Sequence, residues 1–349
     1  MTAAAGAPEQ SPGWKRPLLI TASLAIAVGL LVGVLPAIAN IGEVWRAIQT
    51  LTWLESGSLL ALAAWNIATY QLVIMSALPG LTIGRAFVVG QISTAVTNTL
   101  PAGSAVGVGI TYAMFSSFGF DAGSIAIASV VTGLWNTFVK LGLPIVALAL
   151  LSFQGQGNAA LQSAAITGVV ILVVAVGVLG LTLARESFAR ASGERLGRIS
   201  SAVARRFRRG PFEAWGERLA VFRIQSIDLL RRRWHWVTLA TVVSHLSLFF
   251  MLLAALRHMG VGADTVTGPE ALAAFAIVRL LTALPITPGG LGVVEVGYTT
   301  ALVVAGGDEE LVVAGVLIYR ALSYLLQVPL GLLAYAIWRT RGDWRATAK

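Results

Sequence analysis

Apolar residues in this chain gather into long runs that short polar stretches separate. A helix needs about 20 consecutive apolar residues to cross the hydrocarbon core of a bilayer, and several of the runs reach that length. The pattern therefore predicts an all-α polytopic membrane protein with about six full spans. These spans are predicted over residues 17–39, 57–78, 122–151, 160–184, 234–256 and 310–338. The first run is longer than the 7–15-residue core of a signal peptide, so we expect a retained helix.

Two other apolar regions, residues 84–118 and 270–304, are interrupted by proline and glycine. Pro101 divides the first region, and Pro285 and Pro288 divide the second. Proline removes a backbone hydrogen bond and breaks a helix. Broken backbone at membrane depth is tolerated only where protein or a water-filled cavity covers it. We therefore predict two broken or re-entrant helical hairpins, with a new helix that starts directly after Pro288.

The two broken regions belong to a weak internal repeat. The offset that aligns Pro101 with Pro288 also aligns Asp121 with Asp308, and the repeat units cover about residues 57–151 and 234–338. Three predicted crossings separate the hairpins, so the hairpins enter the membrane from opposite faces. This arrangement is an inverted repeat, which many secondary transporters use to build a site near the midplane. Residues 17–338 then form one membrane domain.

Composition and charge agree with this topology. Of the 349 residues, 56% are hydrophobic and 12% are charged, and the formal net charge is +9. Between residues 185 and 233 there are 13 arginines and 5 acidic residues, a difference of +8. We expect this basic segment to lie on the membrane surface as an amphipathic helix, not to bind nucleic acid. The positive-inside rule places it in the cytoplasm with both termini, the polar, disordered residues 1–16 and the basic tail 339–349.

The sequence contains no pattern that supports catalysis. Cysteine is absent, and the three histidines show no metal-ligand spacing. The glycine-rich residues 103–109 follow no predicted strand, so they do not form a dinucleotide-binding motif. We expect no enzyme activity, no metal and no cofactor.

Several polar side chains fall inside predicted membrane segments, where a charge needs a partner or water. Arg279 and Arg320 could form a cationic pocket for a phosphate or carboxylate beside the helix start at residues 288–292. Alternatively, Arg320 and Glu295 form a structural ion pair, and both interpretations can hold. We expect Lys140 to extend toward the interface, Asn98 to cap free backbone and His245 to be a packing residue. The predicted substrate-binding residues are Arg320, Glu295, Arg279, Pro288, Gly289, Gly290, Gly292, Asn98, Pro101 and Gly103.

The second broken region also carries a family resemblance. Pro288, Gly289, Gly290, Gly292 and Glu295, followed by Ile318, Tyr319 and Arg320 in the last span, resemble the transmembrane domain of lysylphosphatidylglycerol synthases. That domain defines a wider group of flippase-like integral membrane proteins, and the resemblance covers about residues 18–338. It implies a bilayer domain that moves a lipid between leaflets. The chain stops soon after its last span, so we expect no soluble aminoacyl-transferase domain and no lipid aminoacylation.

The resemblance and the polar residues lead to one functional hypothesis and two alternatives. The leading hypothesis is a flippase of the cell membrane that moves an anionic-headgroup lipid. Its partners would be an anionic or aminoacylated phospholipid or a polyprenyl-phosphate-linked lipid. The alternatives are a secondary transporter of a soluble anionic solute, and a scaffold that recruits envelope-biosynthesis enzymes through residues 185–233. Many family members carry Arg and Glu near the first Pro-Gly turn, and this chain carries neither.

Overall fold

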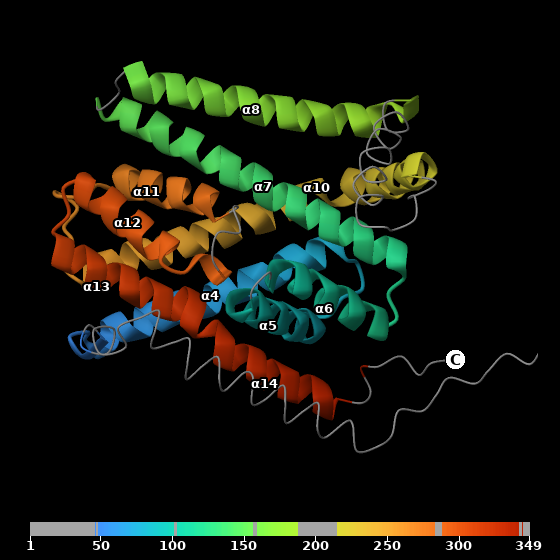
Figure 1. Ribbon diagram of the computed structural model, residues 1–349, viewed down its shortest axis with the longest axis horizontal. Coiled ribbons are helices and arrows are strands. Elements are labelled where there is room, and N and C mark those ends of the chain that lie inside the picture. The colour runs from blue at the N-terminus through green and yellow to red at the C-terminus, as the bar shows by residue number, and fades with distance from the viewer. Residues whose placement is uncertain are drawn as a thin grey trace, which may run out of the picture.

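The computed structural model describes residues 46, 48–100, 103–155, 159–187, 215–282, 288–341 and 344. Within these residues every regular element is helical, as predicted (Figure 1). The first half contains α4 (Trp53–Ala77), α5 (Ile83–Thr99), α6 (Gly103–Ser117), α7 (Ala122–Phe153) and α8 (Ala159–Ala184). The second half contains α10 (Trp215–His258), α11 (Gly268–Leu281), the short turn η1 (Pro288–Gly290), α12 (Val293–Val304), α13 (Glu309–Arg320), the π-turn η2 (Ala321–Leu325) and α14 (Gln327–Thr340).

Among the described residues, four helical stretches are long and apolar enough to cross a membrane: Trp53–Ala77, Ala122–Phe153, Ser226–His258 and Glu309–Thr340. The predicted span at residues 160–184 is α8, of which the shorter stretch Ile166–Leu181 is apolar in the described part. The predicted first span, residues 17–39, the N-terminal residues 1–16 and most of the tail 339–349 lie outside the described residues. The chain is thus a multi-pass membrane protein with an all-helical fold.

Two features differ from the predictions. The basic segment does not form a separate surface helix up to residue 233, because α10 runs without a break from Trp215 to His258 over 44 residues. Its arginines at 231–233 therefore continue directly into the span, while residues 188–214 lie outside the described part. The last span also contains a π-turn, in which Leu326 N–H donates to the Ala321 carbonyl at 2.8 Å.

Side-chain caps set the start of the long helices. Asp121 accepts a hydrogen bond from Ser124 N–H at 2.9 Å at the start of α7. Asp308 accepts from Glu310 and Leu311 N–H, both at 3.1 Å, at the start of α13. An N-cap carboxylate satisfies amide groups that the first helical turn leaves free. The two aspartates that the repeat aligns, Asp121 and Asp308, therefore both act as N-caps of the helix that follows each hairpin.

The predicted hairpins correspond to α5–α6 and α11–α12, whose helices of 12–17 residues are each shorter than a full span. In Figure 1, α5 lies along α14, and α12 packs on α13 at the other end of the last helix. The tip of the second hairpin, η1, contacts α5. The described part of the second tip therefore contacts the first hairpin inside the molecule, although the face from which each hairpin enters the membrane stays a prediction.

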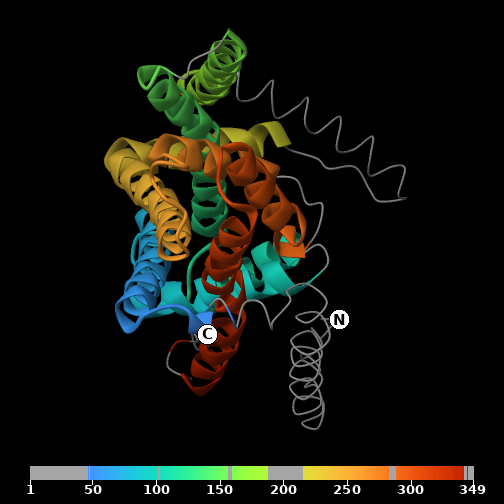
Figure 2. The same ribbon diagram turned by 90° about the vertical axis from the view of Figure 1, so that its left-hand side faces the viewer.

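Two buried apolar clusters support these hairpins. One joins α10, α11, α12 and α13 around Phe275, Tyr298 and Leu302. The other joins the end of α4 with α5, α6, α7 and α14 around Leu78 and Val88. Figure 2 shows that α8 and the neighbouring end of α7 extend away from this packed part of the molecule.

The close approach of α14 to α5 gives a prediction for stability. A Cβ on Gly331 would overlap the Ala95 side chain and lie 2.9 Å from the Gln91 carbonyl, whereas a Cβ on Gly133 of α7 would meet nothing within 4 Å. Gly331→Ala should destabilise the protein by about 1–3 kcal/mol through overpacking. Gly133→Ala, the matched control, should be neutral or stabilise by up to about 1 kcal/mol. Thermal unfolding in detergent measures both, and equal melting temperatures would contradict the close contact.

Candidate functional site

The second Pro-Gly turn forms the floor of the candidate site. Gly289, Gly290 and Gly292 have φ angles of 58°, 72° and 75°, a region that L-residues with side chains rarely adopt. At Gly289 space is limiting as well, because a Cβ there would overlap the ring of Tyr324. After the short turn at Pro288, α12 starts at Val293 and not directly after the proline. Glycine is therefore required here both for conformation and for close approach.

Glu295 lies in the first turn of α12. The positive end of a helix dipole stabilises a carboxylate there. The sequence predicted a cationic pocket for an anion beside this helix start, and in the structure the first turn of α12 carries the protein's own carboxylate, Glu295. The backbone amides of this turn are therefore not the leading candidates for binding a substrate anion.

Arg320, the last residue of α13, binds this carboxylate and the turn together. Its Nε lies 2.5 Å from Glu295 Oε1, and its Nη2 donates to the Gly289 carbonyl at 3.3 Å. The two side chains are 11% and 20% exposed. The structural interpretation of this pair therefore holds: Arg320 attaches the second hairpin to the last span.

Tyr324 extends the link to the first hairpin. The Arg320 guanidinium lies 4.4 Å from the centre of the Tyr324 ring, and the Tyr324 hydroxyl donates to the Asn98 carbonyl at 2.6 Å. Asn98 thus takes part through its backbone. The sequence analysis missed Tyr324, although its place one turn after Arg320 on a helix signals a shared face.

The first Pro-Gly turn is equally close-packed. A Cβ on Gly103 would lie 2.6 Å from the carbonyl oxygens of Val96 and Thr97, so the start of α6 lies against the end of α5. Thr97 Oγ1 donates to the Gly103 carbonyl at 3.4 Å. Pro101, which the sequence assigned to the site, lies outside the described residues.

A cavity of about 810 Å³ opens where the two hairpin tips meet α4, α7, α10 and the last helix. Its lining includes six of the ten predicted substrate-binding residues, namely Asn98, Gly103, Arg279, Gly289, Gly290 and Arg320. None of its described lining residues is Asp or Glu. The lining polar residues from these elements are Asn66, Tyr70, Gln91, Thr94, Thr97, Asn98, Ser104, Asn136, Lys140, Ser244, His245, Arg279, Thr282, Tyr298, Tyr319, Arg320, Ser323, Tyr324 and Gln327.

Two cations in this lining lack a counter-charge. Among the described residues, no carboxylate lies within 4.0 Å of Arg279 or Lys140, and the buried Nε of Arg279 has no hydrogen-bond acceptor. Lys140 lines the cavity, so the expectation that it only extends toward the interface is wrong. The reason is that α7 turns this face toward α11, which carries Arg279. With Arg320 neutralised by Glu295, the cavity carries two uncompensated positive charges.

His245 is buried as predicted, with 5% exposure. Its Nδ1 lies 3.0 Å from the Thr241 carbonyl, while its buried Nε2 has no partner and belongs to the cavity wall. Buried polar atoms without partners are uncommon in folded proteins. Gln91 Oε1 and Ser323 Oγ are also buried without a hydrogen-bond partner. This cavity therefore offers neutral hydrogen-bonding groups as well as positive charge.

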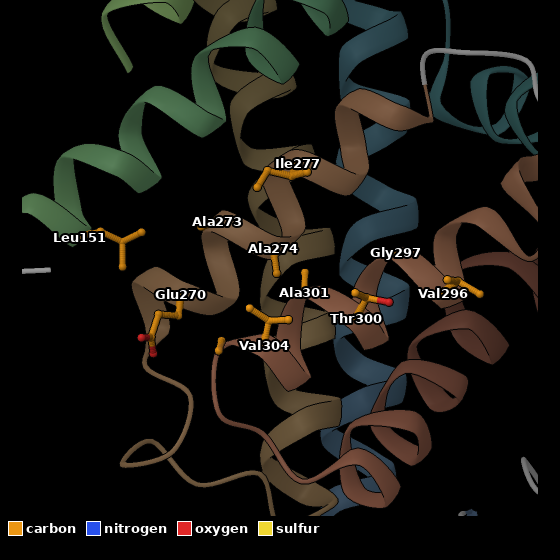
Figure 3. A pocket seen from close by; sticks show the side chains of 11 residues that line it. Leu151, Glu270, Ala273, Ala274, Ile277, Val296, Gly297, Thr300, Ala301 and Val304 are labelled. Carbon is orange, nitrogen blue, oxygen red and sulfur yellow. The ribbon is translucent and has the colours of Figure 1, made fainter. Parts of the chain in front are cut away.

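A second, apolar groove of about 570 Å³ lies between α11, α12 and the end of α7 (Figure 3). Ala273, Ala274, Thr300 and Ala301 keep it open because their side chains are small. The groove shares no lining residue with the cavity: Ile277 lies in the groove, and Arg279, two positions later on α11, lies in the cavity. The hairpin α11–α12 is thus a wall with one cationic face and one apolar face.

Comparison with known proteins identifies a family. The family model described as the lysylphosphatidylglycerol synthase TM region matches residues 20–331, most of the chain. Among curated proteins, none matches. The matched range includes Glu295, Arg320 and the Pro-Gly turn, on which the resemblance in the sequence was based.

The partly buried ion pair yields the prediction of this subsection. Glu295→Gln leaves the Arg320 guanidinium without its counter-charge, and because the two side chains are 11% and 20% exposed, the loss should approach the roughly 3–5 kcal/mol of a fully buried pair. The exposed pair of Arg232 with Asp228, whose side chains are 77% and 69% exposed, is the matched control. Asp228→Asn should cost at most about 0.5 kcal/mol.

Thermal unfolding in detergent again measures both variants. Replacing both partners, as Glu295→Gln with Arg320→Gln, should recover part of the loss because no unpaired charge remains. If Glu295→Gln unfolded at the wild-type temperature, the pair would not hold the second hairpin in place.

Proposed function

The chain belongs to the lysylphosphatidylglycerol synthase transmembrane-region family, and from this premise we propose that it moves a lipid with an anionic headgroup across the cell membrane. The observation that carries the proposal is the pair of uncompensated cations, Arg279 and Lys140, in the cavity between the hairpin tips. A charged side chain at membrane depth costs about 2.5–3.5 kcal/mol even on insertion scales. Retaining two such charges without a counter-charge is understandable if the substrate brings the negative charge.

The size of the cavity fits a headgroup and not a whole phospholipid. About 810 Å³ lies in the range of small-molecule sites, which are roughly 300–1,000 Å³. The phosphate would lie between Arg279 and Lys140, and the neutral groups on Gln91, His245 and Ser323 would bind the polar remainder. The acyl chains would stay in the bilayer.

The apolar groove supports a lipid over a soluble anion. It lies on the other face of the α11–α12 wall. The charged residue in its described lining is Glu270 at the rim, which takes part in the capping box of α11. We propose that an acyl chain occupies this groove while the headgroup is in the cavity. A soluble anion has no apolar chain that could occupy this groove.

The contact between the two hairpin tips provides the proposed gate. Arg320 and Tyr324 join the second turn to the end of α5. If the hairpins enter from opposite faces, as the repeat predicts, shifting this junction would expose the cavity to one leaflet and then to the other. We further propose that both termini are cytoplasmic, and that the protein transports and does not catalyse a reaction.

Lipid translocation in proteoliposomes tests the headgroup site. The substrates are fluorescent chain-labelled phosphatidylglycerol, its lysyl ester, a polyprenyl phosphate and phosphatidylcholine, with dithionite bleaching as the readout. Arg279→Gln and Lys140→Gln should each lower the rate for an anionic lipid about tenfold or more, because a lost charge-assisted hydrogen bond costs roughly 1.5–3 kcal/mol. Arg85→Gln is the control, since Arg85 contacts Phe118 and does not line the cavity.

Equal rates for all variants, or movement of phosphatidylcholine as fast as the anionic lipids, would contradict the proposal. Movement of a soluble phosphate ester and of no lipid would favour the solute transporter. If the cavity variants kept the protein's function in cells and only charge reversal at residues 231–233 abolished it, the scaffold would be favoured.

The groove gives a separate prediction. Thr300→Trp places a large ring in the apolar groove and leaves both cations of the cavity in place. If an acyl chain occupies the groove, lipid movement should fall several-fold, while binding of the soluble headgroup glycerol phosphate should not change. Thr300→Ser, which keeps the groove open, is the control. Unchanged lipid movement in Thr300→Trp would place the acyl chains elsewhere.

A further inference from the structure

A third hollow, of about 720 Å³, lies between α4 and α10 on the outside of the helix bundle. It shares no lining residue with the central cavity or with the groove of Figure 3. Its walls are a stripe on α4 that includes Trp65 and Leu72, and a stripe on α10 that includes Arg233, Trp236 and Leu239. We name this hollow the α4–α10 groove. Neither the family match nor the proposed transport cycle assigns it a role.

The two helices that form the groove run antiparallel. Ser58 Oγ lies 2.8 Å from His258 Nε2 at one end, and Asn66 donates to Ser247 at 2.7 Å further along. Asn66 lines the central cavity, and Thr69, which lies 3.4 Å from Ser247 through its hydroxyl, lines the groove. This polar seam separates the cavity from the groove.

One end of the groove is cationic. Arg232 and Arg233 both line it, and no described lining residue is Asp or Glu. Arg232 uses its Nε to pair with Asp228 at 3.1 Å. Among the described residues no carboxylate lies within 4.0 Å of the half-buried Arg233. A guanidinium binds a phosphate oxygen pair through a planar fork, so these two residues suit a phosphodiester.

The rest of the groove is apolar and exposed. Trp65, Leu72, Trp236 and Leu239 are 55%, 45%, 57% and 55% exposed. At about 1.5 Å per residue, the stripe on α4 from Ser76 to Trp65 is about 16 Å long. Its cationic end is at the C-terminal end of α4, near Ala77, and its apolar end reaches toward the middle of the span. This is the order of a phospholipid in a bilayer, with phosphate at the surface and acyl chain inside.

We propose that the α4–α10 groove binds one anionic phospholipid as a resident lipid that the protein does not transport. Its phosphodiester lies on Arg232 and Arg233, and one acyl chain lies along Trp236, Leu239 and Trp65. A zwitterionic lipid is disfavoured, because its ammonium group would meet two arginines and no acidic lining residue. Basic pockets between helices at a membrane surface are a recognised way of holding anionic headgroups. The bound lipid joins α4 to α10 on the side away from the central cavity.

Native mass spectrometry of the full-length protein in detergent tests this. The protein is titrated with dioleoyl-phosphatidylglycerol, dioleoyl-phosphatidylcholine and glycerol 1-phosphate. The first phosphatidylglycerol should bind at least tenfold more tightly than phosphatidylcholine. Arg232→Gln with Arg233→Gln should lower that affinity roughly ten- to thirtyfold, since each basic residue near an anionic headgroup contributes about a fivefold step.

Two further variants make the result specific. Arg231→Gln is the matched control, because it removes the same charge from the neighbouring position, which does not line the groove. Ala240→Trp keeps both arginines but fills the apolar part, and it should also lower phosphatidylglycerol binding. Arg279→Gln, in the central cavity, should leave this binding unchanged, so the groove and the transport site are tested separately.

Three results would overturn the proposal. Equal binding of the two phospholipids would show that charge does not select the occupant. An equal loss in Arg231→Gln would show diffuse attraction to a basic helix surface. Binding of glycerol 1-phosphate as tight as that of the whole lipid would show a free-phosphate site that does not use the apolar part.

Discussion

The ion pair between Arg320 and Glu295 is the interaction on which the site depends. Residues 288–292 of the second hairpin are not α-helical, so contacts from another part of the protein hold them in place. Arg320 does this by binding the Glu295 carboxylate and the Gly289 carbonyl from the last helix. Because its charge is neutralised there, Arg320 does not compete with Arg279 and Lys140 for an anion. The same pair thus supports the turn and leaves the net charge of the cavity to two other residues.

Helical content, long spans and two interrupted regions could be read from the sequence. Hydropathy reports length and apolarity, and proline and glycine report where a helix cannot continue. The pairing of Arg320 with Glu295 was also within reach, since two opposite charges in one apolar region have few other partners. Family membership followed from the residues around the same turn and is confirmed by the match over residues 20–331.

Other features depend on tertiary packing and carry no local signal. Lys140 faces the cavity because α7 packs on α11, and a lysine in an apolar run looks the same whether it faces a cavity or an interface. The merging of the basic segment with α10 was missed because tryptophans at 234 and 236 resemble the edge of a span. Tyr324 was missed because its role depends on the carbonyl of Asn98, which is distant in sequence.

The π-turn in the last helix has a mechanical consequence. It holds one residue more than an α-helical turn, so it offsets everything after it by about 100° around the helix axis. Arg320 precedes the turn, Tyr324 lies within it, and Gly331, which packs on α5, follows it. If the π-turn became regular α-helix, α14 would rotate about its axis against α5, while the contacts of α13 with the second hairpin stayed the same. The π-turn therefore sets the rotation of α14 on α5 relative to that of α13 on the second hairpin.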